Sequence, residues 1–126
     1  MTMMNKPGKR GIPRLIAAAG YSIKGFKAAW RHEEAFRIEA TLAVLFLPAA
    51  FWIGETLAHQ LVLIVTCFIV IVAELTNSAI EAVVDRVSAE KHPLSGQAKD
   101  IGSALVFATL ILFAIVWILS IWHHFR

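Results

Sequence analysis

The sequence predicts an all-α membrane protein with an N-terminal amphipathic surface helix followed by three transmembrane helices. Apolar residues make up 58% of the 126 residues and charged residues 17%, whereas a soluble domain averages roughly 45–50% apolar and about 25% charged. The mean hydropathy is +0.67. This composition disfavours an ordinary soluble domain and is too apolar for a disordered chain. The length suits one integral-membrane domain over residues 1–126, and the single cysteine excludes a disulfide framework within the chain.

Residues 12–32 are predicted to form a helix that lies in the membrane interface. At about 100° per residue, its apolar side chains fall within one arc and its basic side chains fall outside that arc. The apolar residues are Ile12, Leu15, Ile16, Ala19, Ile23, Phe26 and Trp30, and the basic ones are Arg14, Lys24, Lys27 and Arg31. A basic amphipathic helix of this kind is typical of interfacial helices, and a simple anchor on anionic lipid is the alternative to a functional role.

Three segments, at about 35–53, 57–87 and 100–122, are predicted to span the bilayer. Residues 101–122 carry no charge and would form a helix of roughly 33 Å, enough to cross a hydrocarbon core of ~30 Å. The first span contains Pro48, which predicts a local kink. The second span is longer than a bilayer requires, so its last turns are expected to stand in the cytoplasmic interface.

The distribution of basic residues predicts the orientation of the chain. Eleven of the 12 Lys and Arg residues lie before or at the start of the first span, or around the loop between the second and third spans. Only Arg126 follows the last span. The positive-inside rule therefore places the N-terminus in the cytoplasm and the C-terminus on the opposite, periplasmic side.

The second span carries a stripe of polar residues. Glu74, Asn77, Glu81 and Asp85 fall within about an 80° arc of one helix face. An acid at mid-bilayer costs roughly 2.5–3.5 kcal/mol to insert, and such residues tend to face a protein interior or a water-filled cavity. A protonated Glu74 that bonds a neighbouring helix is the structural alternative, but four polar groups on one face favour a functional site.

The loop before the third span adds further charged groups. Residues 90–100 are predicted to form a turn-rich cytoplasmic loop because they contain Pro93 and Gly96. Lys99 and Asp100 are expected to open the third transmembrane helix. A lysine beside a helix N-terminus is suited to a phosphate anion.

Two more carboxylates, Glu33 and Glu39, lie where the surface helix gives way to the first span. Carboxylates suit Mg²⁺, which takes one or two of them together with substrate phosphates. A carboxylate in a low dielectric can also accept a proton from an alcohol. These groups favour phosphoryl transfer to a hydroxyl carried by a membrane lipid. A small proton-coupled multidrug transporter is the rival hypothesis, and a non-enzymatic membrane subunit is a third.

Several other features narrow the choice. The chain has no Walker A sequence and no Gly-rich kinase loop, and its five histidines show no metal-ligand spacing. No nucleic-acid partner is expected. Cys67 is interpreted as a small apolar packing residue. Self-association would cover the polar stripe, and small residues such as Ala79, Ala82 and Gly102 permit close helix contact.

Residues 74–86, with the sequence ELTNSAIEAVVDR, resemble the signature of the prokaryotic diacylglycerol kinases. The resemblance extends to shorter motifs at residues 18–22, 28–30, 94–96, 98–100 and 102–104. It covers the chain from about Arg14 to Phe125. A motif of this length is far more specific than a lone short pattern.

The resemblance implies a homotrimeric enzyme of the bacterial inner membrane. Such an enzyme moves the γ-phosphate of ATP to diacylglycerol with the help of Mg²⁺ and gives phosphatidic acid. A related subgroup phosphorylates undecaprenol instead, and the shared motifs leave both acceptors open.

The resemblance also implies roles for individual residues. Glu74 would be the general base for the lipid hydroxyl, and Asn77 would orient groups beside it. Glu33 and Glu81 would hold the metal, with the adjacent Glu34 as a competitor for the role of Glu33. The ATP contacts would come from Arg14, Tyr21, Glu33, Glu81, Glu90, Lys91, His92, Lys99 and Asp100. The lipid contacts would come from Arg14, Ala19, Ser22, Ile23, Trp30, Glu74, Ser103 and Trp117.

Overall fold

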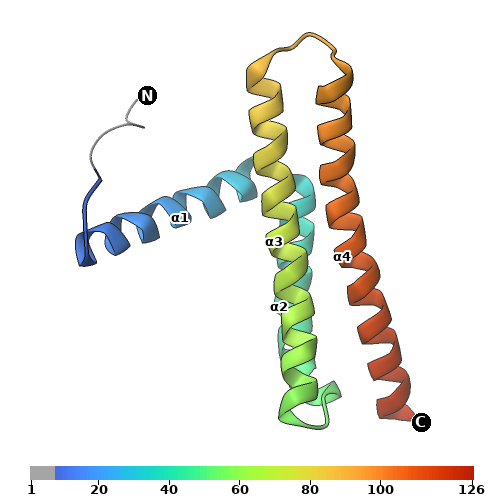
Figure 1. The fold of residues 1–126 in the computed structure, drawn as a ribbon. Coiled ribbons are helices and arrows are strands. Elements are labelled where there is room, and N and C mark those ends of the chain that lie inside the picture. Colours follow the sequence, from blue (N-terminus) through green and yellow to red (C-terminus); the bar gives the residue numbers. More distant parts are fainter. Residues whose placement is uncertain (1–7) are drawn as a thin grey trace.

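The computed structural model describes residues 8–126 as four helices, with no strand among these residues. The helices are α1 (Ile12–His32), α2 (Glu34–Ile53), α3 (Leu57–Val87) and α4 (Pro93–Phe125). Figure 1 shows α1 projecting sideways from a bundle formed by the other three. The predicted surface helix and first two spans match α1, α2 and α3 to within one residue at each end. Lys6, one of the basic residues used for the orientation, lies outside the described residues.

The corner between α1 and α2 consists of one non-helical residue. Glu33 adopts an extended backbone (φ −119°, ψ 107°), which ends α1 and lets α2 begin in a new direction. Arg37 Nη1 donates to the carbonyl oxygens of Trp30 at 2.7 Å and of Arg31 at 3.3 Å. These bonds satisfy carbonyls that the end of α1 leaves without helical partners.

The third span begins earlier than predicted. Lys99 and Asp100 do not open α4, which starts at Pro93 and is capped by His92, whose Nδ1 accepts a hydrogen bond from Leu94 N at 3.0 Å. Proline is favoured at the first position of a helix because its missing N–H has no partner there in any case. The predicted loop at 90–100 is therefore wrong, and the connection is only residues 88–92.

The buried core lies in the half of the bundle that holds the α2–α3 loop and the C-terminus, here called the far end. Trp117 of α4 is 3% exposed and packs with its ring edge-on to Phe46 of α2 at 4.9 Å between centroids. Its Nε1 donates to Thr66 Oγ1 of α3 at 3.0 Å. Cys67 is buried in the same cluster, so its interpretation as a packing residue is confirmed.

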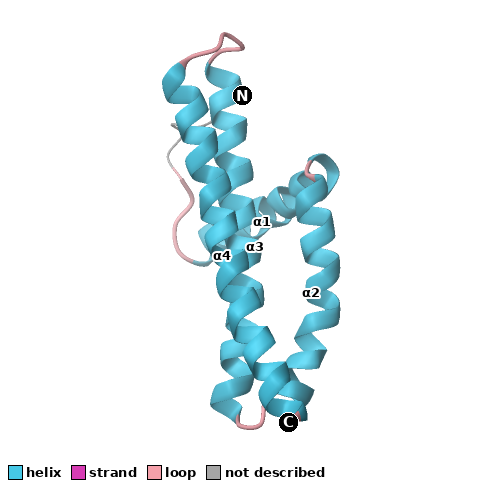
Figure 2. Ribbon diagram, turned by 90° about the vertical axis from the view of Figure 1, so that its right-hand side faces the viewer, coloured by secondary structure: helices cyan, strands magenta, loops and turns pink. Residues whose placement is uncertain are grey.

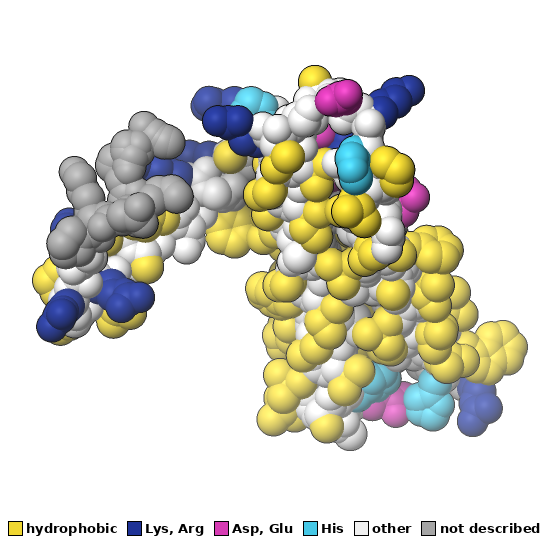
Figure 3. Space-filling model, turned by 45° about the horizontal axis from the view of Figure 1, so that its top comes forward, with side chains coloured by type: hydrophobic (Ala, Val, Ile, Leu, Met, Phe, Trp, Pro, Cys, Tyr) yellow, Lys and Arg dark blue, Asp and Glu magenta, His cyan; other side chains and the backbone are white. Residues whose placement is uncertain are grey.

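The outer surface of the bundle is apolar. α2, α3 and α4 are each long and apolar enough to cross a membrane, and α2 is continuous through Pro48. Large apolar side chains along these helices are exposed, among them Val44, Phe68 and Phe107. Figure 3 shows Lys and Arg side chains gathered over α1 and around the α3–α4 loop, with hydrophobic side chains covering the spans. This surface is that of a multi-pass membrane protein.

The other half of the bundle, here called the site end, is built mainly from α3 and α4. Figure 2 shows these two helices running alongside each other past the start of α2 to the loop that joins them. α3 and α4 pack against each other and α2 packs against α3. The polar stripe of α3 therefore passes from the three-helix region into the two-helix extension.

Candidate active site

The polar stripe of α3 begins at a buried carboxylate. Glu74 is only 5% exposed, and one turn later Asn77 Nδ2 donates to Glu81 Oε1 at 3.0 Å. The i, i+4 spacing of these two residues brings their side chains together on the helix surface. The structure thus directs the Asn77 amide toward Glu81, whereas the family resemblance assigns it to groups beside Glu74.

Four carboxylates surround the point where α1, α2 and α3 meet. The negative charges of Glu33 and Glu81 both act on Glu74, and the charge of Glu74 acts on Glu39. Oε2 of Glu39 is buried with no hydrogen-bond partner. Like charges repel each other, so a cation bound among these carboxylates would lower that repulsion.

An apolar groove of about 520 Å³ runs between α1 and α3 beside this cluster. The α1 side includes Ser22 and ends at Glu33, and the α3 side is formed by Leu75, Ser78, Ala79 and Ala82. The small α3 residues leave room along the groove. Its shape and apolar lining suit a hydrocarbon chain, with Glu33 as a charged group at one end.

A second and more polar pocket, of about 650 Å³, lies at the α3–α4 loop. It gathers several predicted nucleotide contacts from a short stretch of chain: Glu90, Lys91, His92 and Lys99. Asp85 also lines it, and its Oδ1 lies 2.6 Å from Lys99 Nζ. Asp100, the residue after Lys99 on α4, is exposed and does not line this pocket.

The carboxylates fit a magnesium ion that is held largely by a nucleotide. Within residues 8–126, no three His, Cys, Asp or Glu side chains are close enough to hold a metal ion by themselves. Asn77 donates a hydrogen bond to Oε1 of Glu81. The negative charges of Glu33 and Glu81 both act on Glu74. Mg²⁺ takes one or two carboxylates and completes its shell with water and phosphate oxygens. These donors therefore suit Mg²⁺ better than a metal bound in an all-protein cage.

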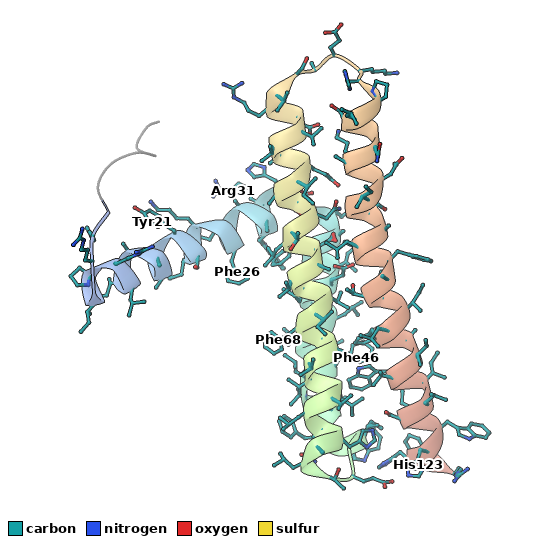
Figure 4. The ribbon with its side chains drawn as sticks, in the orientation of Figure 1. Tyr21, Phe26, Arg31, Phe46, Phe68 and His123 are labelled. Carbon is teal, nitrogen blue, oxygen red and sulfur yellow. The ribbon has the colours of Figure 1, made fainter. Side chains whose placement is uncertain are left out.

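Other predicted contacts are not brought to these pockets within one chain. Figure 4 shows Tyr21 on the part of α1 that projects from the bundle, where it is 70% exposed. Arg14, Ala19 and Ile23 lie on this same part of α1 and line neither pocket.

Three other predicted lipid contacts also lie apart from one another. Trp30 is half-exposed near the α1–α2 corner, and Ser103 is exposed on α4. Trp117 is buried against Thr66, which lies eight residues before Glu74 on α3, about 12 Å along the helix axis. In one chain, Trp117 therefore serves the core.

Residues 20–121 match the family described as prokaryotic diacylglycerol kinase. Diacylglycerol kinase of Escherichia coli (strain K12) is 46% identical over 115 residues, which cover 91% of this chain and 94% of that protein. The chain belongs to the prokaryotic diacylglycerol kinase family. Diacylglycerol kinase of Pseudomonas aeruginosa is 46% identical over 110 residues, with 87% and 89% coverage. The Helicobacter pylori (strain 26695) enzyme is 39% identical over 111 residues, with 88% and 87% coverage.

Membership of the prokaryotic diacylglycerol kinases confirms the family resemblance and the prediction that the chain is an enzyme. The transporter and the non-enzymatic subunit are set aside by these matches over nearly the whole chain. The kinase also has features that the sequence did not reveal. Lys99 pairs with Asp85, and Gly102 of α4 is pressed against Asn77. Both contacts depend on the register of α3 against α4. The sequence indicates only that small residues permit close contact between helices, and it does not indicate which residues face each other.

Proposed function

We propose that this kinase transfers the γ-phosphate of Mg·ATP to the hydroxyl of diacylglycerol and gives phosphatidic acid. Diacylglycerol is proposed as the acceptor because the relatives are named diacylglycerol kinases. The observation that carries the mechanism is the position of Glu74, a carboxylate 5% exposed within an apolar helix. It precedes Leu75 and Ser78, which line the groove between α1 and α3, by one residue and by about one helical turn. A buried carboxylate on the helix that forms one wall of an apolar groove is well placed to meet the polar end of a lipid.

Glu74 is proposed to act as the general base. The hydroxyl oxygen of the lipid forms a bond to the γ-phosphorus while the bond from that phosphorus to the bridging oxygen of ADP breaks. Glu74 accepts the hydroxyl proton as this happens. Phosphoryl transfer needs little more from a protein than positioning and charge neutralisation, so a membrane helix can supply it.

The nucleotide is proposed to bind at the site end. Glu74 and Glu81 are separated by about 10.5 Å along α3, which leaves a deep carboxylate for the lipid and a shallow one for the nucleotide. Glu33 and Glu81 would hold Mg²⁺, which neutralises phosphate charge when it is bound. Lys99 and residues 90–92 line the loop pocket and would contact the ATP phosphates and nucleoside.

The kinase is further proposed to work as a homotrimer in the bacterial inner membrane, with its site end in the cytoplasm. Lys and Arg concentrate at the site end and on α1, as the positive-inside rule requires of the cytoplasmic face. Glu81 and Asp85 are not buried within one chain, and lipid-facing carboxylates are costly. Neighbouring copies would cover them and could bring Arg14 and Tyr21 to a shared site.

The test is ADP release in detergent micelles with Mg·ATP and dioleoylglycerol, with undecaprenol assayed in parallel. Glu74→Gln is expected to lower kcat by about 10²–10⁴-fold, the range for loss of a general base, while Mg·ATP still binds. Glu81→Gln is expected to weaken Mg·ATP binding itself. Glu55→Gln, at the far end, is the matched control and should keep full activity.

Three results would overturn parts of this proposal. The absence of lipid-dependent ADP release from the unsubstituted chain would refute the function. Full turnover in both Glu74→Gln and Glu81→Gln would refute the assigned site. A higher kcat/KM for undecaprenol than for dioleoylglycerol would reassign the acceptor and leave the chemistry unchanged.

A further inference from the structure

Gly102 of α4 lies against the functional stripe of α3. It is buried, and a Cβ added there would overlap Asn77 Oδ1 and would stand 3.3 Å from Asn77 Cγ. The other glycines inside helices of the described chain, Gly20, Gly25 and Gly96, have nothing within 4 Å of such a Cβ. The close approach is therefore specific to one pair of residues, and only glycine allows it.

The contact selects one orientation of the Asn77 side chain. Asn77 Nδ2 donates to Glu81 Oε1 at 3.0 Å, while Oδ1 is buried without a hydrogen-bond partner. A flipped amide would turn its oxygen toward the Glu81 carboxylate and lose this bond. The hydrogen that a Cβ would replace on Gly102 faces Oδ1, an arrangement found for Cα–H···O contacts between helices.

We propose that Gly102 is a positioning residue, which lets the Asn77 amide approach α4 and donate to Glu81. The inference rests on the proposed role of Glu81 in binding Mg·ATP. Gly102 itself does not contact the nucleotide in this proposal. It determines where the Asn77 amide can lie, and Asn77 in turn holds one oxygen of Glu81 so that the carboxylate faces the nucleotide in a fixed orientation.

Kinetics provide the first test, through the variants Gly102→Ala and Asn77→Ala and their combination. Each single variant is expected to raise the KM for Mg·ATP about tenfold, because a hydrogen bond to a charged group is lost, with a smaller change in kcat. The double variant should have the same KM as Asn77→Ala, because Gly102 acts through Asn77. Additive effects of the two substitutions, or a Gly102→Ala variant with unchanged KM, would overturn the proposal.

Nuclear magnetic resonance provides a second test that does not require activity. The chain has two asparagines, Asn5 and Asn77, so ¹⁵N-asparagine labelling gives two side-chain amide groups, and Asn77→Ala assigns them. Gly102→Ala should shift the Asn77 amide signal. Gly20→Ala makes the same chemical change in open space and should leave that signal in place.

The second test also separates this inference from the proposed function. A chain without lipid-dependent ADP release would refute the function, yet the Asn77 signal would still report the contact. Where Gly102→Ala alone does not fold, the double variant Gly102→Ala/Asn77→Ala should fold, because it removes the side chain that the added methyl group would overlap. An Asn77 signal that Gly102→Ala leaves unmoved, or a double variant that unfolds as Gly102→Ala does, would overturn the inference.

Discussion

Replacing Thr66 with valine isolates one buried hydrogen bond between α3 and α4. Thr66 and Trp117 are both 3% exposed, and Trp117 Nε1 donates to Thr66 Oγ1 at 3.0 Å. Valine keeps nearly the volume of threonine but leaves the indole N–H without an acceptor. The carbonyl of Leu63, which accepts from the Thr66 hydroxyl at 2.6 Å, retains its place in the helix.

The expected loss of stability is about 1–2 kcal/mol. An orphaned buried donor costs roughly 1–3 kcal/mol, whereas pairwise side-chain bonds within membrane proteins average about 0.6 and reach about 1.7 kcal/mol. We expect a loss at the lower end of the cost for an orphaned donor, because the indole N–H of the unfolded chain finds other hydrogen-bond partners in the micelle. Trp117→Phe should cost more, since it also removes ring area that packs with Phe46 and Phe113.

A double-mutant cycle measures the bond itself. Unfolding of Thr66→Val, Trp117→Phe and the double variant by SDS in mixed micelles, followed by circular dichroism, should give a coupling energy of about 1 kcal/mol. Thr109→Val is the matched control, because Thr109 also donates to its own helix, at Val106 O, and it should change stability little. A coupling energy below about 0.3 kcal/mol, which is the error of additivity, would refute the reasoning.

Two further perturbations probe the two ends of the bundle. Asp85→Asn removes the exposed carboxylate that pairs with Lys99 and frees the Lys99 ammonium for the nucleotide. The KM for Mg·ATP should therefore fall about two- to fivefold with kcat unchanged, whereas a rise in KM would mean that Asp85 orients Lys99 for the nucleotide. Ser120→Ala removes the bond of 2.8 Å between His59 Nε2 and Ser120 Oγ, so it should lower the free energy of unfolding by about 1 kcal/mol and leave kcat unchanged; equal stability would show that this bond is not needed at the far end.

Most of the fold could be predicted from periodicity and charge. The arc of apolar residues defined α1, and the apolar runs located α2 and α3, because burial in lipid leaves few other arrangements for such sequences. The start of α4 was missed because the uncharged run was equated with the helix. Pro93 begins the helix seven residues before Asp100, in a segment whose charges extend beyond the span.

The sequence could predict which site residues share a face of one helix, but not which residues of two different helices meet. The spacing of Glu74, Asn77 and Glu81 placed them on one face, because 3.6 residues per turn applies to any helix. The pairing of Lys99 with Asp85 required the register of α3 against α4 across the five-residue loop. The inward packing of Trp117, predicted for the lipid site, likewise depended on which face of α4 meets α3.

The structure separates stability from chemistry along the bundle. At the far end, α2, α3 and α4 share an aromatic core with a buried hydrogen bond, and His59 joins α3 to Ser120 of α4. At the site end, α3 and α4 continue past the start of α2, and their contact includes the approach of Gly102 to Asn77. A chain this small has no separate catalytic domain, so its functional groups must lie on the spans themselves. The functional groups lie beyond the far-end core. Polar residues at the site end therefore disturb the packing little, because the far end holds the helices in register.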